Sequence, residues 1–328
     1  MNCFWLEDAL QELEQRFISG RMAHACLIAG PEGLGKLELA RQVAVTLLCQ
    51  KQEAKACGVC RSCVLFAGGA HPDFRLLTFE VNQKNGKLRT ELVIGQVREL
   101  NASMQLTNTI SPRKVALLYP AEAMNRNTAN ALLKTLEEPL GEAVLLLVAH
   151  DPSRLAATIR SRCQKISVRL PDEQAAVNWL ASQKKVDTEA ARMALRASAG
   201  SPLRALRLLE QGNMEQFRFV EKMLVDIGAG EVAVAGVMDA CSALDEHELW
   251  TWLSLISARR LRACFDRAGG TGKGHGESTA RESGTHLHRQ LCLLQSLADN
   301  NRRVLTTSLR KDLLLRDWLI QWSRLTPA

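Results

Sequence analysis

The sequence lacks any hydrophobic run long enough to cross a membrane, which takes about 20 consecutive apolar residues. Its longest apolar run, Ala143 to Ala149, has the length of a buried strand. The N-terminal residues carry no basic stretch and soon turn acidic at Glu7 and Asp8. Because a secretory signal needs a basic stretch ahead of an apolar one, we expect a cytoplasmic protein without membrane contact.

Aromatic residues are scarce, at 5% of the chain, and no internal repeat is present. Proteins that bind single-stranded nucleic acid alone combine aromatic side chains with a concentrated basic groove. Here Lys and Arg are scattered along the chain, which disfavours that class of protein. The net charge of +7 leaves two interpretations open. It indicates either contact with nucleic acid or another polyanion, or an ordinary solvated basic surface.

Ten cysteines in a cytoplasmic chain favour metal binding or free thiols over disulfides. Four of them follow the spacing C-x7-C-x2-C-x2-C, and we call Cys49, Cys57, Cys60 and Cys63 the cysteine cluster. Zinc binds four thiolates tetrahedrally, and a C-x2-C turn brings two sulfurs to one ion. The cluster therefore predicts a structural Zn²⁺ site, to which His71 contributes nothing because four sulfurs complete the shell. The alternative is a set of unrelated free thiols.

A phosphate-binding pattern precedes this cluster, in residues 30–36, which we call the glycine loop. Gly30, Gly33, Gly35 and Lys36 match G-x-x-x-x-G-K-[S/T], between an apolar run and a helical one. Backbone N–H groups and the lysine ammonium could hold phosphates at the helix N-terminus. The final position is Leu37, which has no hydroxyl to offer Mg²⁺. The loop therefore predicts slow hydrolysis at most, and it leaves open whether ATP binds or the turn is vestigial.

Apolar periodicity predicts alternating strands and helices up to residue 170, which indicates a parallel α/β sheet. We expect strands at 24–29, 73–77, 115–119, 143–149 and 165–168, and helices at 6–17, 36–48, 93–104, 127–136 and 153–160. Beyond Pro171 the pattern is helical throughout, in short segments over 173–209 and longer ones from 214 onward. A glycine-rich loop is expected over 269–284; no strand precedes its Gly-x-x-Gly-Lys pattern, so a second phosphate loop is not expected.

Two further blocks carry a resemblance to a known family. Residues 130–139 read N-A-L-L-K-T-L-E-E-P, and Ser161-Arg162-Cys163 follows downstream. With the cysteine cluster after the glycine loop, residues 4–210 resemble the bacterial clamp-loader AAA+ family. The resemblance implies an α/β P-loop AAA+ domain at 1–170, a small helical lid at 171–210 and a C-terminal all-α collar for oligomerisation at 211–328.

The catalytic acids of that family are missing. Its active motor subunits carry Asp-Glu after the second core strand, to hold Mg²⁺ and polarise the attacking water. Here those positions fall on Tyr119 and Pro120, and Glu122 comes two residues too late. Together with Leu37, these losses predict no intrinsic ATPase activity, so that ATP is at most bound without hydrolysis.

The two sensor positions of the family are altered as well. The polar residue after the next strand falls at Ala149 or His150, of which only the imidazole could substitute. The second sensor is an arginine three residues after a glycine. Here that place is taken by Leu203, and Arg204 comes one position late.

The resemblance implies that Arg162 still takes part in chemistry. In this family the arginine of the S-R-C block reaches across a subunit boundary to the γ-phosphate bound by a neighbour. A guanidinium supplied in this way stabilises transition-state charge and is worth ~10³–10⁵ in rate. Arg160 is the weaker candidate for this role, and Cys163 has no neighbouring base, so we interpret it as a packing residue.

The implied partners are the gamma/tau motor subunits and the clamp-opening delta subunit, in a hetero-oligomer. Through this complex the chain would act on the sliding clamp and primer–template DNA, as a component of a DNA-directed DNA polymerase holoenzyme in DNA replication. Two alternatives predict other features. An active motor-type ATPase would need the missing acids, and a zinc-containing protein that binds DNA alone would need a concentrated basic surface.

Overall fold

The computed structural model describes residues 3–82, 86, 88–138, 141–269, 278–303 and 310–325. The chain divides into two compact units, Met1–Trp179 with Gly200–Arg204 and Leu180–Ala199 with Ala205–Ala328. Among the described helices, none combines the length and apolar character that crossing a membrane requires. The elements are η1 (Phe4–Leu6), α1 (Glu7–Ile18), β1 (Ala25–Ala29), α2 (Lys36–Leu48), α3 (Arg61–Ala67), β2 (Phe74–Leu77), α4 (Ile94–Gln105), β3 (Lys114–Leu118), η2 (Ala121–Ala123), α5 (Arg126–Glu137), β4 (Ala143–Ala149), η3 (Pro152–Arg154), α6 (Ala157–Arg160), β5 (Gln164–Ser167), α7 (Glu173–Lys184), α8 (Thr188–Ala197), α9 (Pro202–Gln211), α10 (Met214–Gly228), α11 (Val234–Ser242), α12 (Glu246–Gly269), α13 (Ser278–Arg303) and α14 (Lys311–Ser323).

The first unit is built on a five-stranded sheet in the order β2-β3-β4-β1-β5. Every neighbouring pair of strands is parallel, with Ala25 of β1 opposite Leu145 of β4. Helices connect the strands, as parallel strands require. The predicted parallel α/β fold is therefore confirmed, and the strand boundaries differ from the expected ones by one residue.

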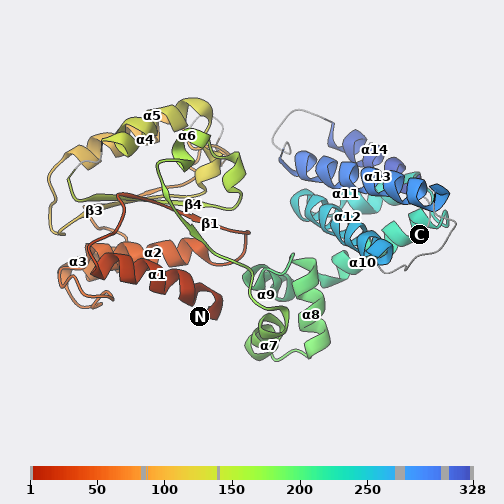
Figure 1. The fold of residues 1–328 in the computed structure, drawn as a ribbon, viewed down its shortest axis with the longest axis horizontal. Coiled ribbons are helices and arrows are strands. Elements are labelled where there is room, and N and C mark those ends of the chain that lie inside the picture. Colours follow the sequence, from red (N-terminus) through yellow and green to blue (C-terminus); the bar gives the residue numbers. More distant parts are fainter. Residues whose placement is uncertain are drawn as a thin grey trace. The chain divides into compact units, whose positions relative to one another are not determined.

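Helices cover both faces of this sheet (Figure 1). In β1, Cys26 and Ile28 pack in the core shared with α1 and α2, whereas Leu27 packs in the core shared with α4 and α5. All of β4 is buried, which is the pattern of a central parallel strand. Burying each of its leucines contributes about 1.5–3 kcal/mol. The sheet therefore offers a rigid frame whose carboxyl edge carries the functional loops.

Two sequence-based expectations were wrong in detail. Residues 153–160 do not form one helix, because Leu155 is extended (ψ 143°) and buried between η3 and α6. The loop was expected to extend to residue 284, but α13 begins at Ser278 and includes Gly284. Residues 270–277 of that expected loop lie outside the described residues.

The second unit is helical, as Figure 1 shows for α10 to α14. Its core is rich in tryptophan. Trp318 and Trp322 lie one turn apart on α14 with stacked rings, 5.4 Å between centroids. Their indole N–H groups donate to the carbonyl oxygens of Leu294 and Leu224, each at 2.8 Å. These bonds tie α14 to α13 and α10. The predicted division into three domains, with boundaries at residues 170 and 210, is finer than these two units and stays a prediction.

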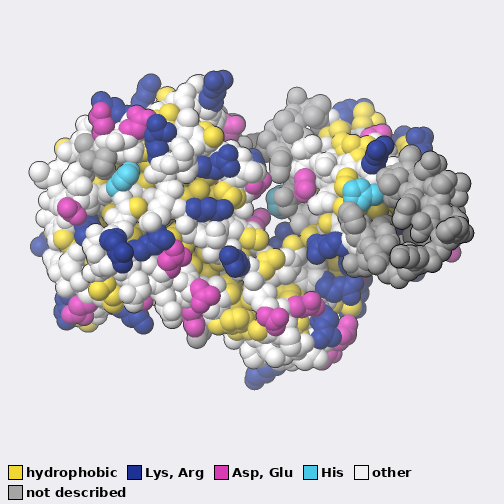
Figure 2. All heavy atoms as spheres, viewed as in Figure 1, with side chains coloured by type: hydrophobic (Ala, Val, Ile, Leu, Met, Phe, Trp, Pro, Cys, Tyr) yellow, Lys and Arg dark blue, Asp and Glu magenta, His cyan; other side chains and the backbone are white. Residues whose placement is uncertain are grey.

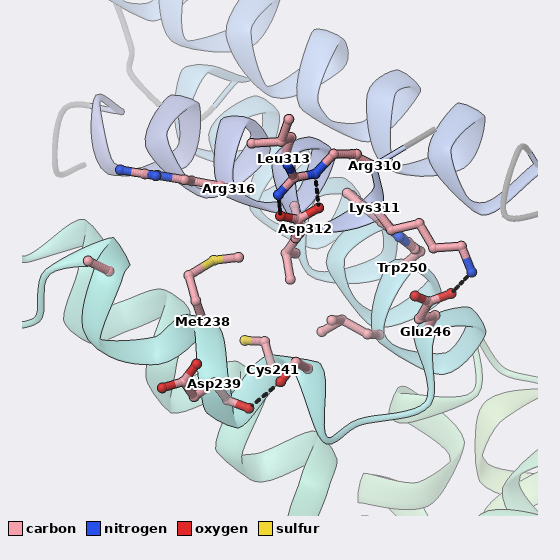
Figure 3. A pocket seen from close by; sticks show the side chains of 14 residues that line it. Met238, Asp239, Cys241, Glu246, Trp250, Arg310, Lys311, Asp312, Leu313 and Arg316 are labelled. Carbon is pink, nitrogen blue, oxygen red and sulfur yellow. Dashed lines mark hydrogen bonds and ion pairs between the residues drawn. The ribbon is translucent and has the colours of Figure 1, made fainter. Parts of the chain in front are cut away.

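Helices α11, α12 and α14 line a cavity of about 550 Å³ in this second unit (Figure 3). Its apolar lining includes Leu249 and Trp250 of α12 and Leu315 of α14. The charged groups at its rim balance one another, three basic against three acidic: Arg310, Lys311, Arg316, Asp239, Glu246 and Asp312. No concentration of one charge gathers there.

Figure 2 shows how charge is distributed over one face of the molecule. On that face Lys and Arg side chains are interspersed with Asp and Glu side chains and do not form one continuous basic patch. This distribution is that of a solvated mixed surface.

Candidate functional site

The glycine loop leaves β1 and enters α2 at the carboxyl edge of the sheet, where a phosphate-binding loop belongs. Gly30 passes so close to β5 that a Cβ there would lie 2.1 Å from the carbonyl oxygen of Val168. Gly33 has φ of +77°, and a Cβ on it would lie 2.8 Å from Cβ of Arg204. Only glycine fits these positions. The structure thus places Gly30, Gly33, Gly35 and Lys36 in one turn.

Lys36 is buried, with 2% of its surface exposed, and its ammonium already has partners. Nζ donates to the carbonyl oxygen of Pro31 at 2.5 Å and to Nδ1 of His150 at 3.0 Å. Burial lowers the pKa of Lys36 to about 8, although Glu122 and Glu32 favour its charged form. The cation expected to bind phosphate is therefore held by the protein itself.

His150 connects this lysine to Tyr119 and to Glu122. Because Lys36 donates to Nδ1, the imidazole hydrogen is assigned to Nε2, which donates to the Tyr119 hydroxyl at 3.2 Å. Glu122 Oε1 accepts the backbone N–H of His150 at 2.8 Å and that of Asp151 at 3.3 Å. Glu122 therefore anchors the loop after β4, two residues beyond the position of a catalytic glutamate.

The start of α9, where the second sensor belongs, is bonded to the glycine loop. Ser201 Oγ donates to the Glu32 carbonyl oxygen at 2.6 Å, and the Leu203 amide donates to the Gly33 carbonyl oxygen at 3.2 Å. The indole of Trp5 donates to the Leu34 carbonyl oxygen at 2.9 Å. These three hydrogen bonds, to three consecutive carbonyl oxygens of the loop, hold the loop against the start of α9 and against η1. The sequence interpretation assigned the second sensor position to Leu203 and did not indicate the contacts of Trp5 and Ser201 with the loop.

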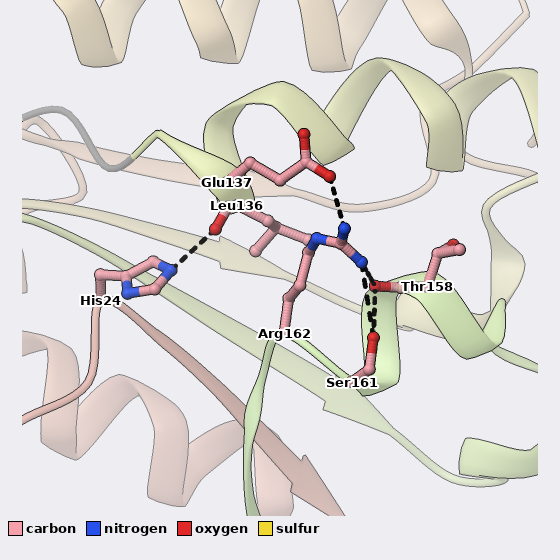
Figure 4. Close-up of polar contacts among 6 residues, drawn as sticks. All are labelled: His24, Leu136, Glu137, Thr158, Ser161 and Arg162. Carbon is pink, nitrogen blue, oxygen red and sulfur yellow. Dashed lines mark hydrogen bonds and ion pairs between the residues drawn. The ribbon is translucent and has the colours of Figure 1, made fainter.

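Arg162 lies just beyond α6, separate from the glycine loop's network, and 36% of its side chain is exposed. Its Nη2 forms an ion pair with Oε1 of Glu137 at 2.6 Å, and Nη1 donates to the Thr158 carbonyl oxygen at 3.0 Å (Figure 4). The neighbouring Cys163 is buried, and burial with the nearby Cys26 raises its pKa to about 12. A thiol of that pKa is a poor nucleophile, in keeping with a packing role.

Glu137 comes from the end of α5, inside the block N-A-L-L-K-T-L-E-E-P, and no sequence pattern indicated that it meets Arg162. The end of α5 is held in place by His24, whose Nε2 donates to the Leu136 carbonyl oxygen at 2.9 Å (Figure 4). On the other side, Thr135 Oγ1 donates to Asn101 Oδ1 at 2.8 Å. The end of this block therefore positions Glu137, the ion-pair partner of Arg162.

The cysteine cluster gathers as its spacing predicts. The four Sγ atoms lie within 4.8 Å of one another, and Cys49 Sγ is 3.7 Å from that of Cys57 and 3.9 Å from that of Cys60. Tetrahedral zinc with Zn–S bonds of ~2.3 Å separates its sulfurs by about 3.8 Å. Cys49 ends α2, and Cys60 and Cys63 open α3. The four residues fit a structural zinc ion.

His71 lies behind this cluster and takes part in a buried hydrogen-bond network. Its Nδ1 accepts the amide of Asp73 at 3.0 Å, so Nε2 donates to Ser62 Oγ at 2.7 Å and Ser111 Oγ at 3.0 Å. Both hydroxyls donate to the carbonyl oxygen of Leu48, the residue before Cys49. Burial lowers the pKa of His71, although Asp73 opposes the shift. His71 thus supports the first ligand-bearing turn through its neighbours.

Family models cover most of the first unit and the helices that follow it. One described as DNA polymerase III, delta subunit, matches residues 5–172. Another, described as the AAA+ ATPase lid domain of DNA polymerase III subunit delta', matches residues 171–210.

Individual relatives show the same likeness. DNA polymerase III subunit delta' of Pseudomonas aeruginosa is 38% identical over 301 residues, which is 91% of this chain and 84% of that protein. Its counterpart in Escherichia coli is 37% identical over 212 residues, or 64% of this chain and 62% of that protein. Among solved structures, a DNA polymerase III gamma subunit-related protein of Thermotoga maritima covers 97% of this chain and 99% of its own, at 18% identity and TM-score 0.42.

Proposed function

The chain belongs to the family of DNA polymerase III delta prime subunits, and from this premise we propose that it is a clamp-loader subunit without ATPase activity of its own. It supplies Arg162 to the ATP site of a neighbouring motor subunit. The observation that carries this proposal is the contrast between two sites. The glycine loop is closed by internal contacts, whereas Arg162 lies at the surface.

The absence of turnover follows from the chemistry of the glycine loop. Leu37 offers no oxygen to Mg²⁺, and Tyr119 and Pro120 stand in place of the two acids. Phosphoryl transfer depends on positioning and on neutralising charge with metal ions, so a site without these groups hydrolyses ATP very slowly. His150 also competes with the phosphates of ATP for the ammonium of Lys36. ATP is therefore bound weakly, if it is bound, and without hydrolysis.

The role of Arg162 is supported by its position and chemistry. Its guanidinium is held by an exposed ion pair, by the Thr158 carbonyl and by a long contact with Ser161 Oγ, contacts that an incoming phosphate can replace. A planar guanidinium binds phosphate oxygens bidentately, which suits it to stabilising charge on a transferring phosphoryl group. In this proposal Arg162 is the one catalytic residue that the chain contributes.

The remaining parts serve assembly. The cysteine cluster holds a structural zinc ion that fixes the end of α2, and the helices after residue 210 form the collar of a hetero-oligomer. The partners are the gamma/tau motor subunits and the clamp-opening delta subunit, and through them the sliding clamp and primer–template DNA. The place of action is the cytoplasm, where this complex loads the clamp during DNA replication.

The test is the clamp- and DNA-stimulated ATPase of a reconstituted loader that contains either the unmodified chain or Arg162→Ala. We expect the variant to assemble normally and to lower the ATPase rate of the neighbouring site by a factor of ~10³ or more, which appears in the total rate as the loss of that site's share. Arg160→Ala, two residues earlier, is the matched control and should keep the full rate. Equal rates for all three complexes would refute the role of Arg162.

A further inference from the structure

We propose that Glu137 is a latch for Arg162. Its carboxylate holds the guanidinium in an ion pair and gives it up when the γ-phosphate of a neighbouring subunit arrives. The inference rests on the proposed function of Arg162 and adds a second, regulatory residue to the same site. Glu137 acts only through Arg162, so it is a positioning residue.

The geometry of the pair is that of a reversible contact. Glu137 Oε1 lies 2.6 Å from Nη2 of Arg162, and the two side chains are 50% and 36% exposed. The pair joins the last residue of α5 to the residue after Ser161, beyond the end of α6 (Figure 4). Water and dissolved anions therefore reach both groups. An anion that approaches Arg162 must compete with this carboxylate.

Hydrogen bonds hold the backbone at the end of α5, next to Glu137, whereas the side chain of Arg162 can rotate toward solvent. The carbonyl oxygen of Leu136, one residue earlier, accepts from the His24 imidazole, and Asn101 accepts from Thr135 and donates to the Ala131 carbonyl oxygen. Arg162 has a long side chain whose second anchor is the Thr158 carbonyl, at 3.0 Å. Release therefore requires rotation of one arginine side chain and no movement of α5.

Electrostatics explains why Glu137 seeks a cation. It stands at the C-terminal end of α5, where the helix dipole makes a carboxylate unfavourable, and Arg162 offsets this cost. A triphosphate carries more charge than one carboxylate and accepts both N–H groups of a guanidinium, so it displaces Glu137 when it is correctly placed. Without that phosphate the latch keeps the arginine neutralised.

The experiment measures ATP hydrolysis by the reconstituted loader, with and without clamp and primer–template DNA, for chains carrying Glu137→Gln. The glutamine keeps the size of the side chain and removes its charge. An exposed ion pair is worth a factor of roughly 1.5 to 5 in equilibrium, so the rate without DNA should rise by about that factor. The rate with clamp and DNA should stay close to that of the unmodified complex.

Two controls separate a latch from a structural effect. Glu138→Gln changes the adjacent exposed carboxylate, which forms no ion pair within the described residues, and it should leave both rates unchanged. In a chain that carries Arg162→Ala, adding Glu137→Gln should change nothing further, because the latch has nothing to hold. The increase caused by Glu137→Gln alone should also shrink at high salt, which screens the ion pair.

The outcomes distinguish the latch from the finger. If Arg162→Ala lowers the rate but Glu137→Gln behaves like Glu138→Gln or lowers it, the finger stands and the latch is wrong. If Glu137→Gln raises the rate equally in the presence of Arg162→Ala, its effect does not pass through Arg162 and the latch is again wrong. If Arg162→Ala changes no rate, the proposed function itself fails.

Discussion

The ammonium of Lys36 lies 3.0 Å from Nδ1 of His150, and the opposite nitrogen of that imidazole lies 3.2 Å from the Tyr119 hydroxyl. The lysine of the glycine loop is thereby joined through His150 to Tyr119. The same lysine is buried, with 2% of its surface exposed, so its charge lies out of contact with bulk water. This arrangement has a measurable cost.

Replacing Lys36 with methionine should stabilise the chain near neutral pH. Lys36 has a pKa of about 8 in the folded protein against 10.5 when exposed, so between these values the folded state binds fewer protons than the unfolded state. The free energy of unfolding of the unmodified chain therefore rises with pH across this window. Below pH 8 the buried charge costs stability, and Lys36→Met should gain about 1–2 kcal/mol there, after the loss of two hydrogen bonds.

Urea unfolding at several pH values between 7 and 10.5 checks this expectation. The advantage of Lys36→Met over the unmodified chain should shrink as the pH rises through 8 toward 10.5. Lys134→Met alters an exposed lysine in the last turn of α5 and should show no such trend. A pH-independent difference for Lys36→Met would show that the lysine is not held in the buried state described.

The isolated chain should release no phosphate from ATP above background. Restoring a hydroxyl with Leu37→Thr should not create activity, because Tyr119 and Pro120 still occupy the places of the two acids and His150 still binds Lys36. Steady-state phosphate release by the purified protein, with Mg²⁺ present, measures both. Turnover by the unmodified chain would favour the motor-type alternative.

The fold could be predicted from local patterns, because short apolar runs mark the strands of this chain and apolar residues at helical spacing mark its helices. β4 is apolar over its whole length and was recognisable as a buried strand, and α2 runs over the predicted residues. The helix expected over 153–160 was wrong because the burial of Leu155 depends on tertiary packing, which local periodicity does not report. Boundaries elsewhere differ by about one residue for the same reason.

The candidate sites were predictable only where their residues are close in sequence. The four cysteines of the cluster lie within one short segment, so their spacing alone was enough to predict that their sulfurs come together. The contacts that close the glycine loop join Lys36 to a residue 114 positions away and Ser201 to one 169 positions away. The pair between Glu137 and Arg162 likewise depends on how α5 and α6 pack. No spacing rule connects such residues.

The purified chain should contain one zinc ion, and removing it should destabilise the first unit. A metal that binds only the folded state stabilises it by about 4 kcal/mol when free metal is ~1,000 times its Kd. Elemental analysis under reducing conditions measures the metal, and thermal unfolding with and without a chelator measures its effect. Cys60→Ser should lose both the metal and the chelator response, whereas Cys292→Ser, outside the cluster, should keep them. Absence of metal from the unmodified protein would leave four free thiols.

Asp73→Asn should destabilise the first unit, because Asp73 joins the loop before β3 to the network behind the cysteine cluster. The carboxylate is 2% exposed and accepts the amides of Thr109, Ile110 and Ser111 at 2.7 to 2.9 Å. Burial alone raises its pKa, but these hydrogen bonds outweigh burial and the pKa is lowered below 3.8. An amide accepts more weakly than a carboxylate, so the loss should be about 1.5–3 kcal/mol at pH 7.

The pH dependence of this loss identifies its cause. A carboxylate with a lowered pKa in the folded state contributes stability that is complete well above pH 3.8 and is lost as the pH falls through its folded value. The gap in unfolding free energy between the unmodified chain and Asp73→Asn should therefore narrow as the pH falls below 3.8 toward the lower pKa of the folded state, where Asp73 becomes protonated and, like the asparagine, carries no charge. Asp239→Asn, at an exposed position of α11, should cost less than about 0.5 kcal/mol at any pH. A gap for Asp73→Asn that stays constant down to acid pH would mean that packing, and not the charge accepting three amides, holds this loop.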